Sequence, residues 1–231
     1  MDNTELLVEK AKKTKKKEYI SLADWFVRMD LAFNNASLPT IYPYLLTVGY
    51  DEAKLESYRS KLTQLKSLDQ EHTKTRADKF ESTEALNEKR REINPLYLQH
   101  RSLLKVLLGG NTLASVSMKL SGKWKKSYSE WFQDVSSFYT QLSQTPELAA
   151  HATSVGITPA VVEAQKQLLT ELQGLKETQR KKTADARTAT ETRDTAFAEL
   201  RKLYAEYIKY ARILLAGNQS LEAIGITVKG R

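Results

Sequence analysis

The chain carries one sequence pattern twice. Residues 49–111 align with residues 156–218 at a shift of 107 without a gap, and 19 of the 63 aligned positions are identical. A repeat of this length indicates two copies of one structural unit. We therefore predict a tandem duplication, with a basic tail at residues 1–17, one repeat unit at 18–123 and a second at 124–231. The match continues upstream at a shift of 106, where Trp25 and Phe26 align with Trp131 and Phe132.

Long parts of each repeat contain almost nothing that would interrupt a helix. The 231 residues include nine Gly and five Pro. After Asp51 and after Thr158, both good N-cap residues, about 60 residues follow before the glycines at positions 110 and 217, with Pro159 at the first helical position and Pro95 as the one interior proline. These features predict an all-α fold built from helical bundles.

A short amphipathic helix begins each repeat, at residues 21–35 and 127–142. Large apolar side chains recur there at spacings of three and four, as one buried helix face requires. We interpret this stripe as core, with ligand stacking as the alternative. In the first copy the stripe is Leu22, Trp25, Phe26, Met29 and Phe33, and in the second it is Trp131, Phe132, Val135, Phe138 and Tyr139.

The long helical segment of each repeat has a polar middle. Heptad-like apolar positions, typical of a coiled coil, lie on both sides of it, but residues 69–79 and 176–188 are polar around the whole circumference. We expect the chain to reverse near 73–78 and near 180–186, so that each repeat forms a helical hairpin and closes as a three-helix bundle. One continuous helix in each repeat is the alternative.

Apolar residues alternate at the end of each repeat. Alternation with a period of two predicts a short extended segment. We align these tails at a shift of 108, which places Leu113, Val116, Met118, Leu120 and Gly122 on Leu221, Ile224, Ile226, Val228 and Gly230.

The sequence lacks the patterns that catalytic and metal sites require. The chain has no Cys, and none of His72, His100 and His151 has a second His three or four residues further on. No phosphate-binding glycine motif, calcium loop or nucleophile motif occurs. We predict a protein that is not an enzyme and that binds no cofactor or metal.

The net charge of +8 is concentrated in two short stretches. One lies in the predicted tail, and the other surrounds Trp124 between the repeats, where Lys119 also lies. Such runs form either a solvated segment or a contact with phosphate groups or another polyanion. The candidate polyanion contacts are Lys10, Lys12, Lys13, Lys15, Lys16, Lys17, Lys123, Lys125 and Lys126.

No window of the sequence is apolar enough to span a bilayer, and the N-terminus has no apolar core or small-residue cleavage site of a secretory leader. We expect a cytoplasmic protein.

The closing residues 221–229, Leu-Glu-Ala-Ile-Gly-Ile-Thr-Val-Lys, follow a charged helical run with Arg193-Asp194 and Arg201-Lys202-Leu203. This arrangement resembles a group of uncharacterised bacterial proteins with a short aromatic helix, a long helical segment and a terminal Ala-Leu-Gly-Ile-Thr-Val-like tail. The chain differs in being less Ala-rich and in carrying the unit twice. The resemblance implies a helical architecture and no particular activity.

These observations favour a non-catalytic helical scaffold or structural protein that binds itself or other assembly components, and a homo-oligomer fits this interpretation. A basic nucleic-acid-associated protein that uses the Lys-rich tail is the alternative. An enzyme with a pocket between the two repeats is a third hypothesis, which needs polar groups converging from both.

Overall fold

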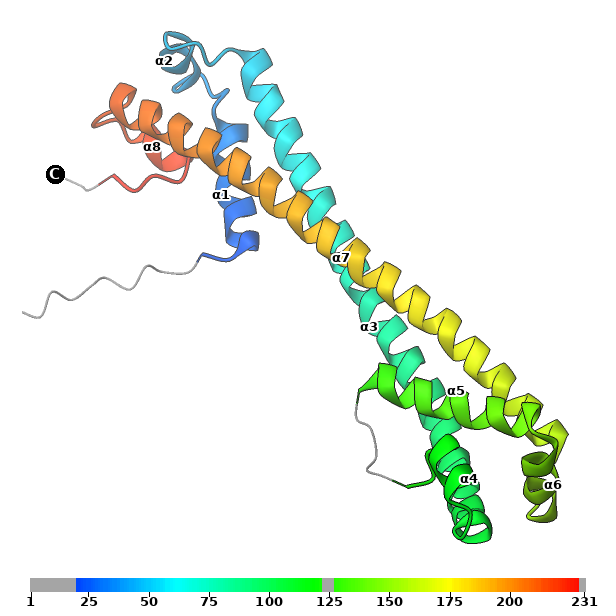
Figure 1. The fold of residues 1–231 in the computed structure, drawn as a ribbon. Coiled ribbons are helices and arrows are strands. Elements are labelled where there is room, and N and C mark those ends of the chain that lie inside the picture. The colour runs from blue at the N-terminus through cyan, green and yellow to red at the C-terminus, as the bar shows by residue number, and fades with distance from the viewer. Residues whose placement is uncertain (1–19, 122–126, 229–231) are drawn as a thin grey trace, which may run out of the picture. The chain divides into compact units, whose positions relative to one another are not determined.

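The computed structural model describes residues 20–121 and 127–228, and every regular element in these residues is an α-helix (Figure 1). The prediction of an all-α fold is confirmed for this part of the chain. The nine polyanion-contact lysines predicted from the sequence lie outside it. The helices are α1 (Leu22–Asn35), α2 (Tyr42–Leu46), α3 (Glu52–Leu108), α4 (Thr112–Ser117), α5 (Tyr128–Gln144), α6 (Pro146–Ser154), α7 (Pro159–Leu214) and α8 (Ser220–Ala223).

The two long helices are continuous, so the predicted hairpins are wrong. Helix α3 runs for 57 residues and α7 for 56, straight through the polar stretches at which we expected reversals. Those stretches contain neither Gly nor Pro, and a helix that is polar all round is stable when ion pairs support it. The ammonium group of Lys182 lies 2.7 Å from a carboxylate oxygen of Asp78, and that of Lys89 lies 3.1 Å from Glu171.

Side-chain caps begin the two short aromatic helices and the two long helices, and the caps predicted at Asp51 and Thr158 are confirmed. Ser21 closes a capping box with Asp24, and Ser127 accepts from the backbone N–H of Glu130 at 3.3 Å. At the start of α3, an Asp51 carboxylate oxygen accepts from the N–H of Lys54 at 2.7 Å, and the Thr158 hydroxyl begins α7 in the same way. These side chains satisfy N–H groups that have no partner within the helix.

The chain divides into two compact units. Unit 1 comprises residues 1–67 and 195–231, and unit 2 comprises residues 68–194. Unit 1 therefore contains α1, α2, the first part of α3, the last part of α7 and α8, and unit 2 contains the remaining parts of the long helices with α4, α5 and α6. Each unit combines the beginning of one predicted repeat with the end of the other, so the boundary predicted at 123/124 does not separate two compact units.

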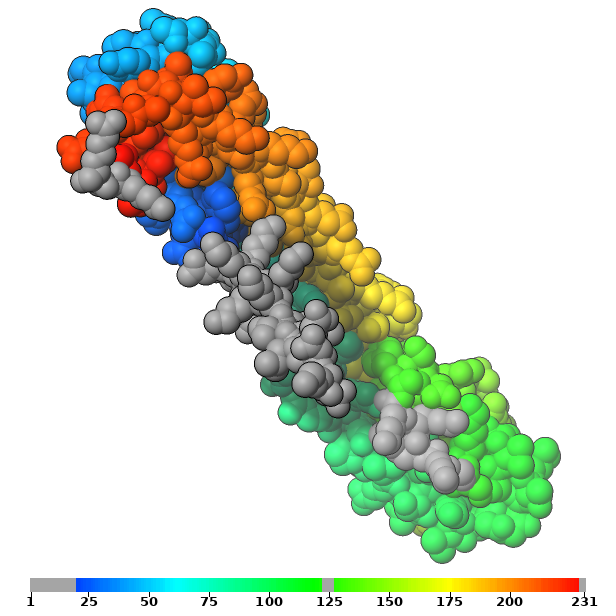
Figure 2. Space-filling model, turned by 90° about the vertical axis from the view of Figure 1, so that its left-hand side faces the viewer, coloured from blue at the N-terminus to red at the C-terminus, as the bar shows by residue number. Residues whose placement is uncertain are grey.

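The core of unit 1 forms where α1 packs on the long helices. Phe33 on α1 and Tyr207 on α7 are fully buried, and the Tyr207 hydroxyl donates to the carbonyl of Ala32 at 3.1 Å. Helix α8 lies beside α1, where Asn35 Nδ2 donates to the carbonyl of Ala223 at 2.6 Å (Figures 1 and 2). The predicted aromatic stripe of the first repeat is thus part of a core.

Unit 2 builds its core in the same manner around α5. Trp131, Phe138 and Tyr139 are buried, and the Trp131 indole N–H donates to Asn94 Oδ1 on α3 at 3.0 Å. The guanidinium of Arg90 lies 4.7 Å from the centroid of the Trp131 ring, a cation–π contact. The second aromatic stripe is therefore also core.

Each unit contains the same set of ring contacts, made by residues at positions that correspond in the repeat. In unit 1 the ring of Phe33 lies 6.0 Å from that of Tyr204 and 5.9 Å from that of Tyr207. In unit 2 the ring of Tyr139 lies 6.4 Å from that of Tyr97 and 6.0 Å from that of His100. Phe33 and Tyr139 differ by 106 positions, and the partners in α7 and α3 differ by 107.

The predicted extended tails are wrong, because the described residues of both tails hold a helical turn and no strand. After α4 and α8 the chain passes through a left-handed residue, Lys119 with φ +50° or Gly225 with φ +79°. The next N–H then closes a helix-ending turn, from Leu120 to the Ser115 carbonyl at 2.9 Å and from Ile226 to the Leu221 carbonyl at 3.0 Å. The two tails therefore correspond at a shift of 106, and the predicted shift of 108 is also wrong.

Among the described helices, none is both long enough and apolar enough to cross a membrane.

A proline in the polar middle of α7 tests its continuity. Lys181 is exposed, so Lys181→Pro removes one helix hydrogen bond and introduces a ring clash while leaving the core intact. We expect it to lower the free energy of unfolding by about 3 kcal/mol in urea titrations followed by circular dichroism. Lys181→Ala should leave stability near that of the wild type, and equal stability of the two variants would indicate a turn at this place.

Expressing the two repeats as separate fragments tests whether each compact unit needs segments from both repeats. Because each core draws on both repeats, we expect the fragments 20–121 and 127–228 not to form folded monomers when each is alone. Mixed together, they should form a one-to-one complex that light scattering coupled to size exclusion resolves. A folded monomer of either fragment would contradict the assembly described above.

Candidate functional site

The residues that the structure describes carry almost no net charge. Of the 36 Lys and Arg residues 11 lie outside the described residues, as do 4 of the 28 Asp and Glu, which leaves 25 cationic against 24 anionic side chains. Lys119, the described member of the basic patch around Trp124, directs its ammonium group to Asp134 Oδ1 at 2.5 Å. A polyanion contact would therefore depend on the lysines outside the described residues.

The three histidines do not come together. His72 Nδ1 lies 2.8 Å from Arg193 Nη1, His100 Nδ1 lies 3.0 Å from the Tyr139 hydroxyl, and His151 is exposed on α6. In the part of the chain that the structure describes, no three side chains of His, Asp or Glu converge in a way that could hold a metal ion. His100 and Tyr139 are core residues, and burial lowers the pKa of His100 below its usual value because the charged imidazolium loses its solvation.

Exposed aliphatic side chains collect where α3 ends and α4 begins. Val106 is 88% exposed and Leu113 82%, although both are large apolar residues. Val116 on α4 is exposed as well. Leu104, Leu108 and Ala114 on the same two helices are buried, and so is Met118, the C-cap of α4. We call this the α3–α4 surface, and it consists of Leu103, Val106, Leu107, Leu113 and Val116.

A related but smaller surface occurs in unit 1. Tyr210 and Ile213 on α7 are exposed at positions that the repeat aligns with Leu103 and Val106. Leu113 and Val116 have no apolar counterparts, because at the structural shift of 106 they correspond to Gln219, the N-cap of α8, and to Glu222 on α8. Of these two related surfaces, the α3–α4 surface in unit 2 is therefore the larger.

Unit 1 contains a guanidinium held by oxygen atoms on several sides. Arg59 on α3 donates to Ser37 Oγ at 2.5 Å, to Glu52 at 2.6 Å and to Glu56 at 3.0 Å. Its Nε also donates to the carbonyl of Phe33 at 3.3 Å. The hydrogen bond to Arg59 lowers the pKa of Glu52, and the same bond raises the pKa of Arg59. This cluster, the Arg59 cradle, ties the start of α3 to the end of α1.

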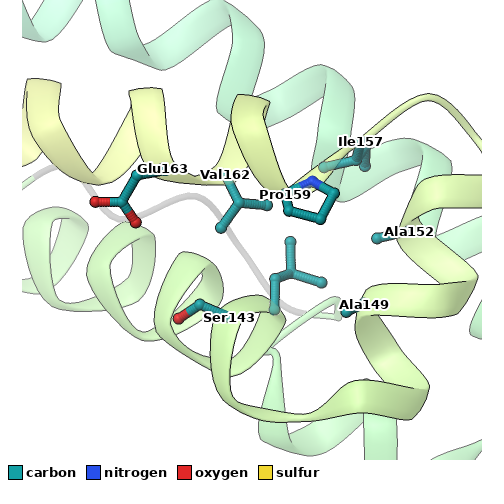
Figure 3. A pocket seen from close by; sticks show the side chains of 8 residues that line it. Ser143, Ala149, Ala152, Ile157, Pro159, Val162 and Glu163 are labelled. Carbon is teal, nitrogen blue, oxygen red and sulfur yellow. The ribbon is translucent and has the colours of Figure 1, made fainter.

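Unit 2 has a pocket at the corresponding place, between α5, α6 and the start of α7 (Figure 3). Its volume is about 200 Å³. Aliphatic side chains line most of it, and Ser143 and Glu163 lie on the side opposite Ala149 and Ala152. The lining residues are Leu142, Ser143, Ala149, Ala152, Ile157, Pro159, Val162 and Glu163.

Two buried polar oxygens lack a hydrogen-bond partner among the described residues, one in each unit. They are the Tyr50 hydroxyl and Gln165 Oε1. Tyr50 lies among other aromatic rings, 5.6 Å from Tyr207 and 6.1 Å from Tyr58 between centroids. Gln165 occupies the position that the repeat aligns with Tyr58, and it lies one helical turn beyond Val162 of the pocket.

No family model, curated protein or solved structure matches the chain.

Sequence reasoning pointed to the lysine runs and missed the α3–α4 surface, the Arg59 cradle and the pocket. The two repeats contain a signal for the pocket. Ser37 and Glu56 recur as Ser143 and Glu163, whereas Tyr42 and Leu45 correspond to the smaller residues Ala149 and Ala152.

We expect the stability of the fold to depend on pH, because the imidazole of His100 is buried. The pKa of His100 is lowered in the folded state, so below the unfolded pKa of about 6.5 the unfolded chain binds more protons. The free energy of unfolding should then fall as the pH decreases from 6.5 through the folded pKa, by up to about 1.4 kcal/mol per pH unit. Urea titrations from pH 7.5 to 5 measure it. His100→Gln should flatten this dependence, and His151→Gln, at an exposed position, should retain it.

Proposed function

We propose that the chain is a non-catalytic helical scaffold that acts by binding protein, including further copies of itself. The observation that carries the proposal is the α3–α4 surface. Contiguous apolar patches are uncommon on soluble monomers and mark interaction sites when they occur. Five aliphatic side chains are exposed on the last turns of α3 and on the next helix, α4, and we infer that they form such a patch.

Exposed apolar residues at the corresponding positions of unit 1 support an interaction role for the α3–α4 surface. Leu103 and Tyr210 are both exposed and apolar, as are Val106 and Ile213, although most aligned positions of the two repeats differ. A surface side chain without a role would be free to become polar. Two related surfaces in one chain suit a protein that holds two similar partners.

We also infer that the chain arose by tandem duplication, with halves of the two copies exchanged between the compact units. The matching ring contacts of Phe33 and Tyr139 support this inference. Left-handed glycines at aligned positions support it as well, because Gly49 has φ +79° and Gly156 has φ +85°. A single copy of such a unit would require a second copy to complete its core.

The non-catalytic part of the proposal rests on the sequence, in which no catalytic spacing of residues occurs. Nucleic-acid binding through the nine lysines is the alternative function, and the near-neutral charge of the described residues makes it depend on those lysines. Cytoplasmic location and the resemblance to uncharacterised bacterial helical proteins stay predictions.

Charge introduced into the α3–α4 surface tests the proposal. We expect the wild-type chain to form complexes, either with itself at rising concentration or with a retained protein, and the double variant Val106→Glu, Leu113→Glu to lose them. Placing two carboxylates in an apolar interface should weaken binding by more than about tenfold. Light scattering coupled to size exclusion measures self-association, and affinity capture followed by quantitative mass spectrometry measures the retained protein.

The matched control is Ser102→Glu with Thr112→Glu, which adds the same charges to exposed polar positions of the same two helices. This control should bind as the wild type does. Complexes that survive in the Val106→Glu, Leu113→Glu variant would refute the proposed surface. A salt-sensitive complex with a DNA duplex that requires residues 1–17 would favour the alternative function.

A further inference from the structure

Unit 1 has larger side chains at the place that corresponds to the pocket of unit 2. When the shift of 107 is extended a few residues upstream of the aligned region, Ala149, Ala152 and Ile157 of the pocket pair with Tyr42, Leu45 and Tyr50. Equivalent backbone hydrogen bonds support two of these pairs: the N–H of Tyr50 donates to the carbonyl of Leu45, and the N–H of Ile157 donates to that of Ala152. In unit 1, Leu45 and Tyr50 are fully buried and Tyr42 packs against the same core.

The polar side of the pocket consists of hydrogen-bond acceptors. The hydroxyl of Ser143 donates a hydrogen bond to the carbonyl of Thr140 at 2.9 Å, so its oxygen can accept a hydrogen bond from a ligand. The carboxylate of Glu163 accepts from the ammonium group of Lys166 at 3.3 Å and is otherwise exposed to solvent. Figure 3 shows both groups on the side of the pocket away from the two alanines. A ligand that fits this side must donate hydrogen bonds or carry positive charge.

Unit 1 shows what the same pair of acceptors binds. Ser37 and Glu56, the aligned counterparts of Ser143 and Glu163, both accept from the guanidinium of Arg59. The residue aligned with Arg59 is Lys166, which reaches Glu163 alone. Unit 1 thus supplies its own cation and its own aromatic ring, whereas unit 2 retains the acceptors and lacks the ring.

We propose that the pocket of unit 2 binds a small organic cation, an arylalkyl ammonium or guanidinium compound, with its ring among Ala149, Ala152 and Ile157 and its charge on Glu163 and Ser143. The size is suitable, because an apolar cavity of about 150 Å³ admits a benzene ring and this pocket measures about 200 Å³. The bound cation takes the place of Lys166 on Glu163. This site is independent of the α3–α4 surface.

The test uses the full-length chain and 2-phenylethylamine as the probe. Isothermal titration calorimetry measures affinity, and methyl chemical shifts of Ala149, Ala152 and Ile157 locate the binding. We expect the amine to bind and to shift these methyl signals. The anionic analogue 3-phenylpropionate should bind at least about tenfold more weakly, because its carboxylate faces Glu163.

Three variants separate charge from volume. Glu163→Gln, at an exposed position, should weaken amine binding by about tenfold without changing the fold. Lys166→Ala should strengthen binding by removing the competing ammonium group. Ala152→Leu with Ile157→Tyr, which introduces the residues of unit 1, should abolish binding, and thermal unfolding shows whether this variant is folded. Glu56→Gln, in the Arg59 cradle of unit 1, is the matched control and should not change the affinity.

Equal affinity of the amine and the anionic analogue would overturn the proposal, as would methyl signals that do not respond to millimolar amine. An arginine-containing peptide that shifts the same signals when the free amine does not would also overturn it and assign the pocket to a protein partner.

Discussion

The distribution of buried positions along the two long helices governs the structure. In α3, the buried residues Leu55, Leu62 and Leu65 are followed by none until Leu86, and Ile93, Tyr97 and Leu104 continue the second group. In α7 Ala186 is the one buried residue between Leu172 and Leu200. Each helix therefore has two apolar faces separated by a charged stretch. Each face needs its own short aromatic helix to exclude water, and two shared helices consequently support two cores.

Local features of this arrangement could be read from the sequence, whereas the pairing of distant segments could not. Cap residues such as Ser21 and Asp51 act on N–H groups three residues away, so their role follows from the adjacent sequence. The hairpin prediction failed because a polar stretch fits both a turn and an exposed helix, and the choice depends on where the apolar faces find partners. The tails were misread because a left-handed helix end, at Lys119 and Gly225, also brings apolar residues into alternation.

The functional features differ in how far they were predictable. Lysine runs are visible in any sequence because charge does not depend on folding. Exposure of Val106 and Leu113 could not be inferred, since an apolar residue in an amphipathic segment is normally buried. The pocket could have been predicted by comparing the two repeats. Unit 2 has Ala149 and Ile157 where unit 1 has the larger Tyr42 and Tyr50, so less side-chain volume is present at these positions.

Retention of Ser143 and Glu163 beside that lost volume argues that the pocket is more than a packing defect. Cavities destabilise a protein by roughly 24 cal/mol per Å³. The 200 Å³ of this pocket would therefore cost unit 2 up to about 5 kcal/mol if it were sealed, and less because it opens to solvent. In unit 1 the three positions paired with Ala149, Ala152 and Ile157 hold larger residues, including the buried Leu45 and Tyr50. Relative to unit 1, unit 2 therefore has smaller side chains around the pocket, the same pair of acceptors, and Lys166 in place of Arg59. This combination is expected when a ligand occupies the space that the chain's own side chains fill in unit 1.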